Sequence, residues 1–131
     1  LQSARDLLAA GGYARFSTSA VAEGAGLTRP AMLYHFGSRR ELLNATIHFL
    51  ALRRIDLFNS AMRAAIARQP GDRARIRLEA VDIALAQVHL PENIAFQELL
   101  SASRTDPELA AVMAPAVRYF DARRNQATLD A

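Results

Sequence analysis

The sequence predicts an all-α protein, and two observations carry that prediction. Apolar residues recur three and four positions apart in segment after segment, which is the spacing of one helix face, whereas few segments alternate as strands do. Residues that begin and end helices also stand between these segments. We therefore expect about eight helices and no sheet in this chain of 131 residues.

The first half of the chain contains four helix signals. A helix at the start of the chain ends at Gly11-Gly12, and two short helices span about residues 18–25 and 29–34. Ser38 begins the fourth helix, because Ser38 and Glu41 have the spacing of a capping box, in which each side chain accepts a hydrogen bond from the other's backbone amide.

The second half contains longer helical segments. The fourth helix continues to Pro70-Gly71, the next spans about residues 73–89, and a shorter one begins at Pro91. The last helix begins at Asp106-Pro107, and Pro115 is expected to kink or split it. One face of the 73–89 segment carries four apolar residues: Leu78, Val81, Leu85 and Val88.

Composition narrows the class of protein. Hydrophobic residues make up 51%, which is typical of a globular domain, and the absence of cysteine excludes disulfides, thiolate zinc sites and cysteine nucleophiles. No apolar run reaches the roughly 18 residues of a membrane span, and no secretion signal opens the chain. We therefore expect a cytoplasmic protein without membrane association.

Charge is concentrated near the N-terminus. Residues 1–54 contain seven arginines and three acidic residues, a net charge of +4, whereas the remaining residues have a net charge of −1. All sixteen basic residues are arginines, whose guanidinium group suits phosphate binding.

The same region has helix-turn-helix spacing. Ala22 is small enough for a close helix crossing, Gly26 can adopt a left-handed turn, and Met32 faces inward from the next helix. We expect Leu27 to fill the turn and Phe36 to join Met32 inside. The residues left facing outward are Thr28, Arg29, Pro30, Ala31, Leu33, Tyr34 and His35. Such a face fits a DNA major groove, where arginine can bond guanine and apolar groups can contact thymine methyls.

The stretch GYARFSTSAVAEGAGLTRPAMLYHFGSRRELL resembles the DNA-binding domain of the TetR family of bacterial repressors. The resemblance implies a helix-turn-helix domain over residues 1–46. It also implies a helical regulatory domain for effector binding and dimerisation over residues 47–131, which we expect to be incomplete because family members usually have a ninth helix.

The resemblance also assigns DNA contacts by position. It implies phosphate contacts from five residues: Ser17, Thr18, Thr28, His35 and Arg39. Base contacts are implied for Arg29, Pro30 and Ala31, and we include Leu33 and Tyr34 in the DNA-facing set. Two positions depart from the family pattern: Phe16 replaces a hydroxyl residue, and Leu33 replaces a tyrosine whose phosphate contact the neighbouring Tyr34 need not take over.

In function, the resemblance implies a homodimeric repressor that a small-molecule effector releases from its operator. We expect a largely apolar effector and a pocket among eleven residues: Phe58, Met62, Ile66, Leu85, Val88, His89, Phe96, Leu100, Met113, Val117 and Phe120. Residues at this spacing are also typical of a plain hydrophobic core. We interpret Arg53 and Arg54 as part of a solvated face.

The sequence also bears on two other classes of function, an enzyme and a protein-interaction module. The sequence has no H-E-x-x-H, P-loop, G-x-G-x-x-G or nucleophile-elbow motif, so we expect no enzyme, no metal and no cofactor. The alternative is a helical protein-interaction module that keeps the helix-turn-helix only as a packing unit.

Overall fold

The computed structural model is all-helical over the part of the chain that it describes, which confirms the predicted fold class. It describes the backbone of residues 1–130 and, within them, the side chains of all residues except 124 and 127–130. Seven α-helices and one 3-10 helix follow in this order: α1 (Gln2–Gly11), η1 (Tyr13–Arg15), α2 (Thr18–Gly24), α3 (Arg29–Phe36), α4 (Arg39–Arg68), α5 (Arg73–Gln87), α6 (Pro91–Ser103) and α7 (Pro107–Asp130).

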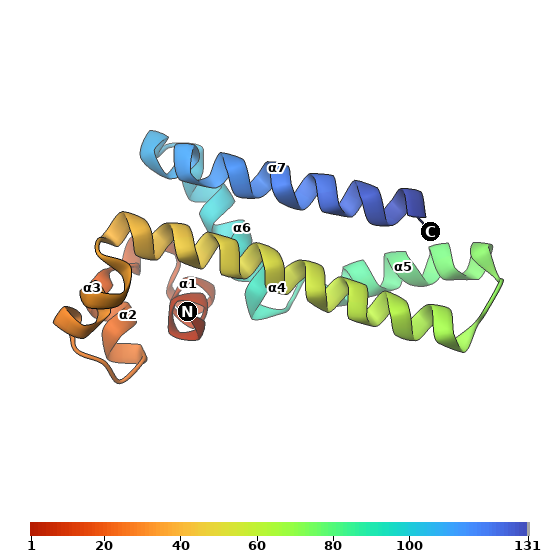
Figure 1. Ribbon diagram of the computed structural model, residues 1–131, viewed down its shortest axis with the longest axis horizontal. Coiled ribbons are helices and arrows are strands. Elements are labelled where there is room, and N and C mark those ends of the chain that lie inside the picture. The colour runs from red at the N-terminus through yellow and green to blue at the C-terminus, as the bar shows by residue number, and fades with distance from the viewer. Residues whose placement is uncertain (131) are drawn as a thin grey trace.

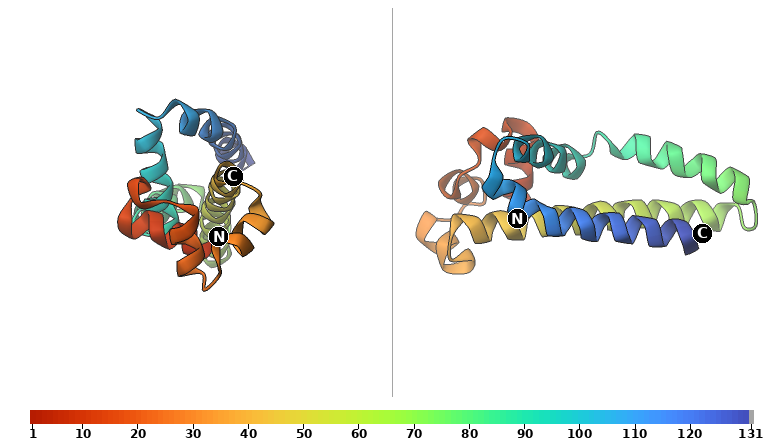
Figure 2. Two further views of the ribbon diagram at one scale, coloured as in Figure 1. Left: turned by 90° about the vertical axis from the view of Figure 1, so that its left-hand side faces the viewer. Right: turned by 90° about the horizontal axis from the view of Figure 1, so that it is seen from above.

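The long helix α4 organises the molecule, which is elongated along it (Figure 1). The helices α1 to α3 gather at its N-terminal end, and we call this group the head. Helix α5 folds back along the far end of α4, while α6 lies against α1. Helix α7 runs beside α4 in the same direction, as the view from above in Figure 2 shows.

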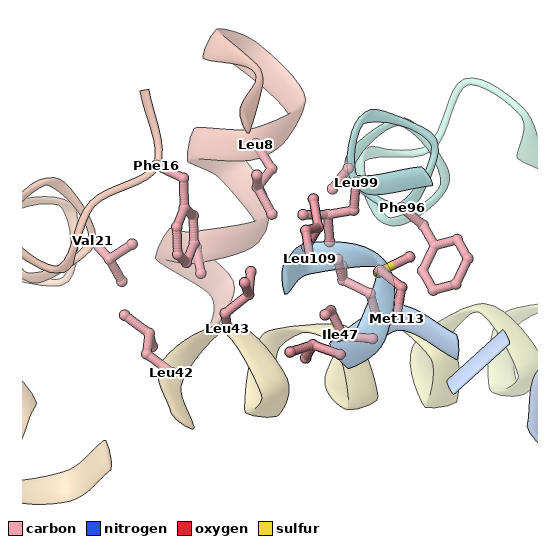
Figure 3. Packing of buried hydrophobic residues seen from close by; sticks show 14 of the residues in the cluster. Leu8, Phe16, Val21, Leu42, Leu43, Ile47, Phe96, Leu99, Leu109 and Met113 are labelled. Atoms are coloured by element: carbon pink, nitrogen blue, oxygen red, sulfur yellow. The ribbon is translucent and has the colours of Figure 1, made fainter. Parts of the chain in front are cut away.

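One hydrophobic core joins the head to the helices that follow it. Leu8 of α1, Phe16, and Val21 of α2 meet Leu42 and Leu43 of α4, and all five side chains are at most 4% exposed (Figure 3). The same cluster continues along α4 into the space between α6 and α7. The predicted domain boundary near residue 46 therefore falls inside α4 and inside this continuous core.

Helix starts follow the predicted caps, with one difference. The side-chain oxygens of Ser17, Thr28 and Ser38 each accept a hydrogen bond from a backbone amide three residues on, and Asp106 does the same for Leu109. The capping box also predicted a hydrogen bond from the Ser38 amide to the Glu41 side chain. This prediction is wrong, because the Ser38 amide donates instead to the Phe36 carbonyl at 2.8 Å.

Two expectations about the C-terminal half need correction. Helix α7 continues through Pro115, so the helix is not split, and the described residues form seven α-helices instead of about eight. Helix α5 is present, but its apolar stripe faces solvent: Leu78, Val81, Leu85 and Val88 are 55–70% exposed. A different face, which includes Ile76, Ile83 and Gln87, is partly covered.

None of the helices in the described part of the chain combines the length and hydrophobicity that a membrane span requires.

Candidate nucleic-acid interface

The turn between α2 and α3 fixes the angle of two short helices. The amide of Leu27 donates to the Ala22 carbonyl at 2.9 Å, and the amide of Gly26 donates to the Glu23 carbonyl at 3.1 Å. This pair of bonds is the Schellman pattern, in which the residue after the helix takes a left-handed backbone. Gly26 has a φ of 70°, as the sequence predicted. Helix α3 therefore leaves α2 in one defined direction.

Helix α3 buries one side and exposes the other. Met32 is 4% exposed and joins the core, and Phe36 is half-buried beside it, as expected. Leu27 was expected inside the turn, but its side chain is 46% exposed, so that expectation is wrong. The Schellman bonds involve the backbone of Leu27 and leave its side chain at the surface.

The N-terminal end of α3 presents the predicted readout residues. Arg29 and Pro30 are exposed in its first turn, directly after the Thr28 cap, and Ala31 is half-buried. The first-turn amides of a helix carry partial positive charge, which favours an approaching phosphate. An exposed arginine and a proline at this end form a surface that a groove could accept.

Leu33 and Tyr34, in the middle of α3, differ in their exposure to solvent. Tyr34 is 88% exposed, and its ring makes an edge contact with His35 at 5.8 Å between centroids. Leu33, which stands where the family usually has tyrosine, is half-buried. Tyr34 and His35 thus project together from the exposed side of the head.

The start of α4 holds a cation beside this surface. The Arg39 guanidinium carbon lies 5.6 Å from the ring centroid of Tyr13 and 5.6 Å from that of Phe16. One of its N–H groups also donates to the Tyr13 hydroxyl at 3.4 Å. Arg39 remains exposed, so these contacts restrict its side chain and leave its charge accessible. The contact of Tyr13 with Arg39 was not predicted from the sequence.

The two hydroxyl residues before α2 lie in different environments. Ser17 is exposed and caps α2, whereas Thr18 is 6% exposed and lies within the packed head. Phe16, which stands where the family pattern has a hydroxyl residue, also has a structural role. Its side chain is only 4% exposed, and its ring lies under the guanidinium of Arg39.

An ion pair connects the head to the rest of the molecule. Arg5 of α1 donates to the carboxylate of Glu92 in α6 at 2.9 Å, and Arg53 of α4 lies 3.9 Å from the same carboxylate. Glu92 is 5% exposed, so these arginines compensate a buried charge. The hydrogen bond to Asp6 and the charges of Asp6 and Glu92 raise the pKa of Arg5, although burial acts in the opposite direction.

A cavity of about 250 Å³ lies between α4, α5, α6 and α7. Three expected effector residues line it, namely Phe58, Val88 and Phe120. The other lining residues are Arg54, Ile55, Asn59, Ala84, Gln87, Asn93, Gln97 and Arg123.

The remaining expected effector residues lie elsewhere. Phe96 and Met113 are buried in the core, and Leu100 and Val117 pack at its edge. Met62 is half-buried outside the lining, while Ile66, Leu85 and His89 are exposed. The structure therefore brings together about a quarter of the predicted set at this cavity.

Arg54 was expected on a solvated face, but it is half-buried and lines this cavity. Its guanidinium carbon lies 4.2 Å from the ring centroid of Phe96 and 4.3 Å from that of Phe120, and its Nε donates to Asn93 Oδ1 at 2.5 Å. Arg53, its neighbour, contacts Glu92. A usable signal was available, because Arg54 stands four residues before Phe58 on the same helix face.

Within the described residues, no group of three or more His, Cys, Asp or Glu side chains could hold a metal ion. The head has a Schellman turn between α2 and α3 and an exposed α3, which is the geometry of a DNA-binding helix-turn-helix.

Comparison with known proteins agrees with this class. Residues 1–46, about a third of the chain, match the family described as bacterial regulatory proteins, tetR family. No curated protein and no solved structure matches the chain. This match identifies residues 1–46 as a DNA-binding domain of the tetR type, which supports a role in transcription regulation.

Proposed function

We propose that this regulator is a repressor that binds its operator as a homodimer and is released by a small molecule. The observation that carries the DNA half of the proposal is the exposed N-terminal end of α3, where Arg29 follows the Thr28 cap and projects from a rigid turn. The cavity between α4, α5, α6 and α7 supports the second half.

Roles within the interface follow from exposure. Arg29, with Pro30 and Ala31, reads base edges in the major groove. Ser17, Thr28, His35 and Arg39 contact phosphates, which position the protein without carrying sequence information. Leu33 and Tyr34 form the adjoining part of the surface. Thr18 is too buried for direct phosphate contact, and we omit it from the proposed set.

The cavity is mechanically connected to the head through consecutive residues of α6. Asn93 lines the cavity and accepts a hydrogen bond from Arg54, while the preceding Glu92 holds Arg5 of α1. A ligand that displaces Asn93 therefore also disturbs the contact that fixes α1. Such a ligand weakens operator binding only if it has different affinities for the two arrangements of the head.

Operator binding is tested by titrating the protein against a DNA fragment from its own promoter and a scrambled fragment of equal length. Measurements at about 50 and 200 mM salt should show tighter binding to the promoter and a steep loss of affinity at high salt, because phosphate contacts release counterions. Equal, salt-insensitive binding to both fragments would contradict operator recognition. It would favour the alternative, a helical protein-interaction module.

A further inference from the structure

The cavity combines positive charge with aromatic surface, which specifies a class of ligand. We propose that it binds a small organic anion, a monocarboxylate with a planar aromatic or short apolar body. This inference rests on the proposed effector role of the cavity, and it names the chemistry of that effector.

The charged side chains among the described lining residues of the cavity are all positive. Two arginines, Arg54 and Arg123, contribute guanidinium groups, and no lining residue is acidic. Four more lining residues carry neutral amides, which can donate as well as accept hydrogen bonds. A charged group in a partly enclosed site interacts more strongly with a counterion than it does in water. The lining therefore favours an anion over a neutral or cationic molecule of the same shape.

Arg54 is fixed in orientation. Its guanidinium carbon lies over the Phe96 ring, 4.2 Å from the centroid, and over the Phe120 ring, 4.3 Å from the centroid, and Asn93 accepts its Nε–H. The planar array of N–H groups in a guanidinium matches the two oxygens of a carboxylate. Because the side chain is already ordered, less rotamer entropy is lost when a carboxylate binds.

Arg123, in α7, is the second arginine of the lining. Its side chain is exposed, its Nε donates to the Tyr119 hydroxyl at 3.2 Å, and its guanidinium carbon lies 5.5 Å from the Tyr119 ring centroid. This arginine adds a second positive charge at the solvent side of the cavity. Arg54 thus marks the inner end of the anion site and Arg123 the outer end.

The rest of the lining determines the body of the ligand. Phe58 and Phe120 supply flat apolar surface, and Ile55 and Val88 supply aliphatic surface. A volume of about 250 Å³ lies just below the range of roughly 300–1,000 Å³ that is common for drug-sized ligands. A single ring or a short chain with one carboxylate fits these properties.

The experiment compares acids with neutral partners of the same shape. Isothermal titration calorimetry of the protein with benzoate, phenylacetate and hexanoate, each against its amide, should show saturable binding of at least one acid and at least about tenfold weaker binding of its amide. An amide that binds as tightly as its acid overturns the proposal. No saturable binding of any acid up to about 10 mM also overturns it.

Variants assign the site to the arginines. Arg54→Gln and Arg123→Gln should each weaken acid binding by about tenfold or more, since each removes a charge-assisted contact. The matched control is Arg118→Gln, an exposed arginine of α7 outside the cavity lining, which should leave binding unchanged. Circular dichroism checks folding, and Arg123→Gln keeps the test decisive if Arg54→Gln does not fold. Equal binding by both variants and the control overturns the proposed site.

Operator binding measured without acid separates the two proposals. If the protein binds its promoter but no acid, the ligand class is wrong and the regulator function stands. If it binds an acid at these arginines but shows no promoter preference, the operator proposal fails and the anion site remains.

Discussion

Arg39 and Arg29 are both exposed arginines of the head, yet their surroundings differ. Arg39 is held by two aromatic rings and the Tyr13 hydroxyl, so its charge occupies a restricted position at the start of α4. Arg29 has no such support among the described contacts and extends from the first turn of α3. A restrained cation suits a phosphate at a fixed place, whereas a free arginine can adapt to a base edge.

This difference predicts distinct effects on DNA binding. Arg29→Ala should flatten the preference among operator variants, because it removes a base contact worth about 1–3 kcal/mol. Arg39→Ala should weaken binding to all sequences alike and lower the salt slope by about one, since it removes a phosphate contact. Fluorescence anisotropy with operator variants at several salt concentrations measures both quantities.

The matched control is Arg77→Ala, which removes an exposed arginine of α5 far from the head. It should change neither sequence preference nor salt slope. If Arg29→Ala left the ranking of operator variants intact, base readout would belong to other residues of α3.

At the scale of elements, local chemistry determined what could be predicted. The starts of α2, α3, α4 and α7 follow from capping side chains, and the turn after α2 follows from Gly26. These features depend on residues within a few positions of one another, so the sequence contains the whole signal. The all-helical class and the outward face around Arg29 were predictable for the same reason.

Tertiary packing determined what could not be predicted. Helical periodicity identified α5 but not its environment, because the apolar stripe that includes Leu78 has no covering element among the described residues. The position of Arg54 over two neighbouring rings depends on Phe96 and Phe120, which are more than 40 positions away along the chain. Likewise, Arg5 and Glu92 are 87 positions apart, and only the packing of α1 on α6 brings them together.

The contact between α1 and α6 leads to a stability prediction. Glu92→Gln removes the carboxylate that accepts from Arg5 and lies near Arg53, although Asp6 remains as a partner for Arg5. Hydrogen bonds to charged groups contribute roughly 1.5–3 kcal/mol, so the free energy of unfolding should fall by about 2 kcal/mol. Urea denaturation followed by circular dichroism measures this change.

Glu98→Gln provides the control on the same helix, because Glu98 is exposed and belongs to none of the ion pairs among the described residues. It should alter the free energy of unfolding by less than about 0.5 kcal/mol. Equal stability of the two variants would mean that the Arg5–Glu92 pair merely offsets its own desolvation.

For the whole molecule, α4 is the common element of the two sites. It has 30 residues, so it extends for about 45 Å, with Arg39 in its first turn and the cavity residues Arg54 and Phe58 near its middle. Because one continuous core joins the head to α6 and α7, the head is attached to the rest of the molecule by more than α4. A change at the cavity can therefore reach the head through α4 and through the Glu92 contact together.

The proposed homodimer makes the last prediction, which concerns operator geometry. Two copies of α3 in successive major grooves on one side of DNA require half-sites about 34–36 Å apart, or a multiple of that distance. Inserting five base pairs between the half-sites turns one of them to the opposite side of the duplex. In each chain the head shares one core with the helices that follow it, so it cannot turn to follow that rotation. Affinity should therefore fall at least about tenfold.

Electrophoretic mobility shifts measure the loss of affinity, and the control places the same five base pairs outside the operator. Unchanged affinity would mean that each chain binds its half-site independently, and light scattering of the free protein would then give the mass of a monomer.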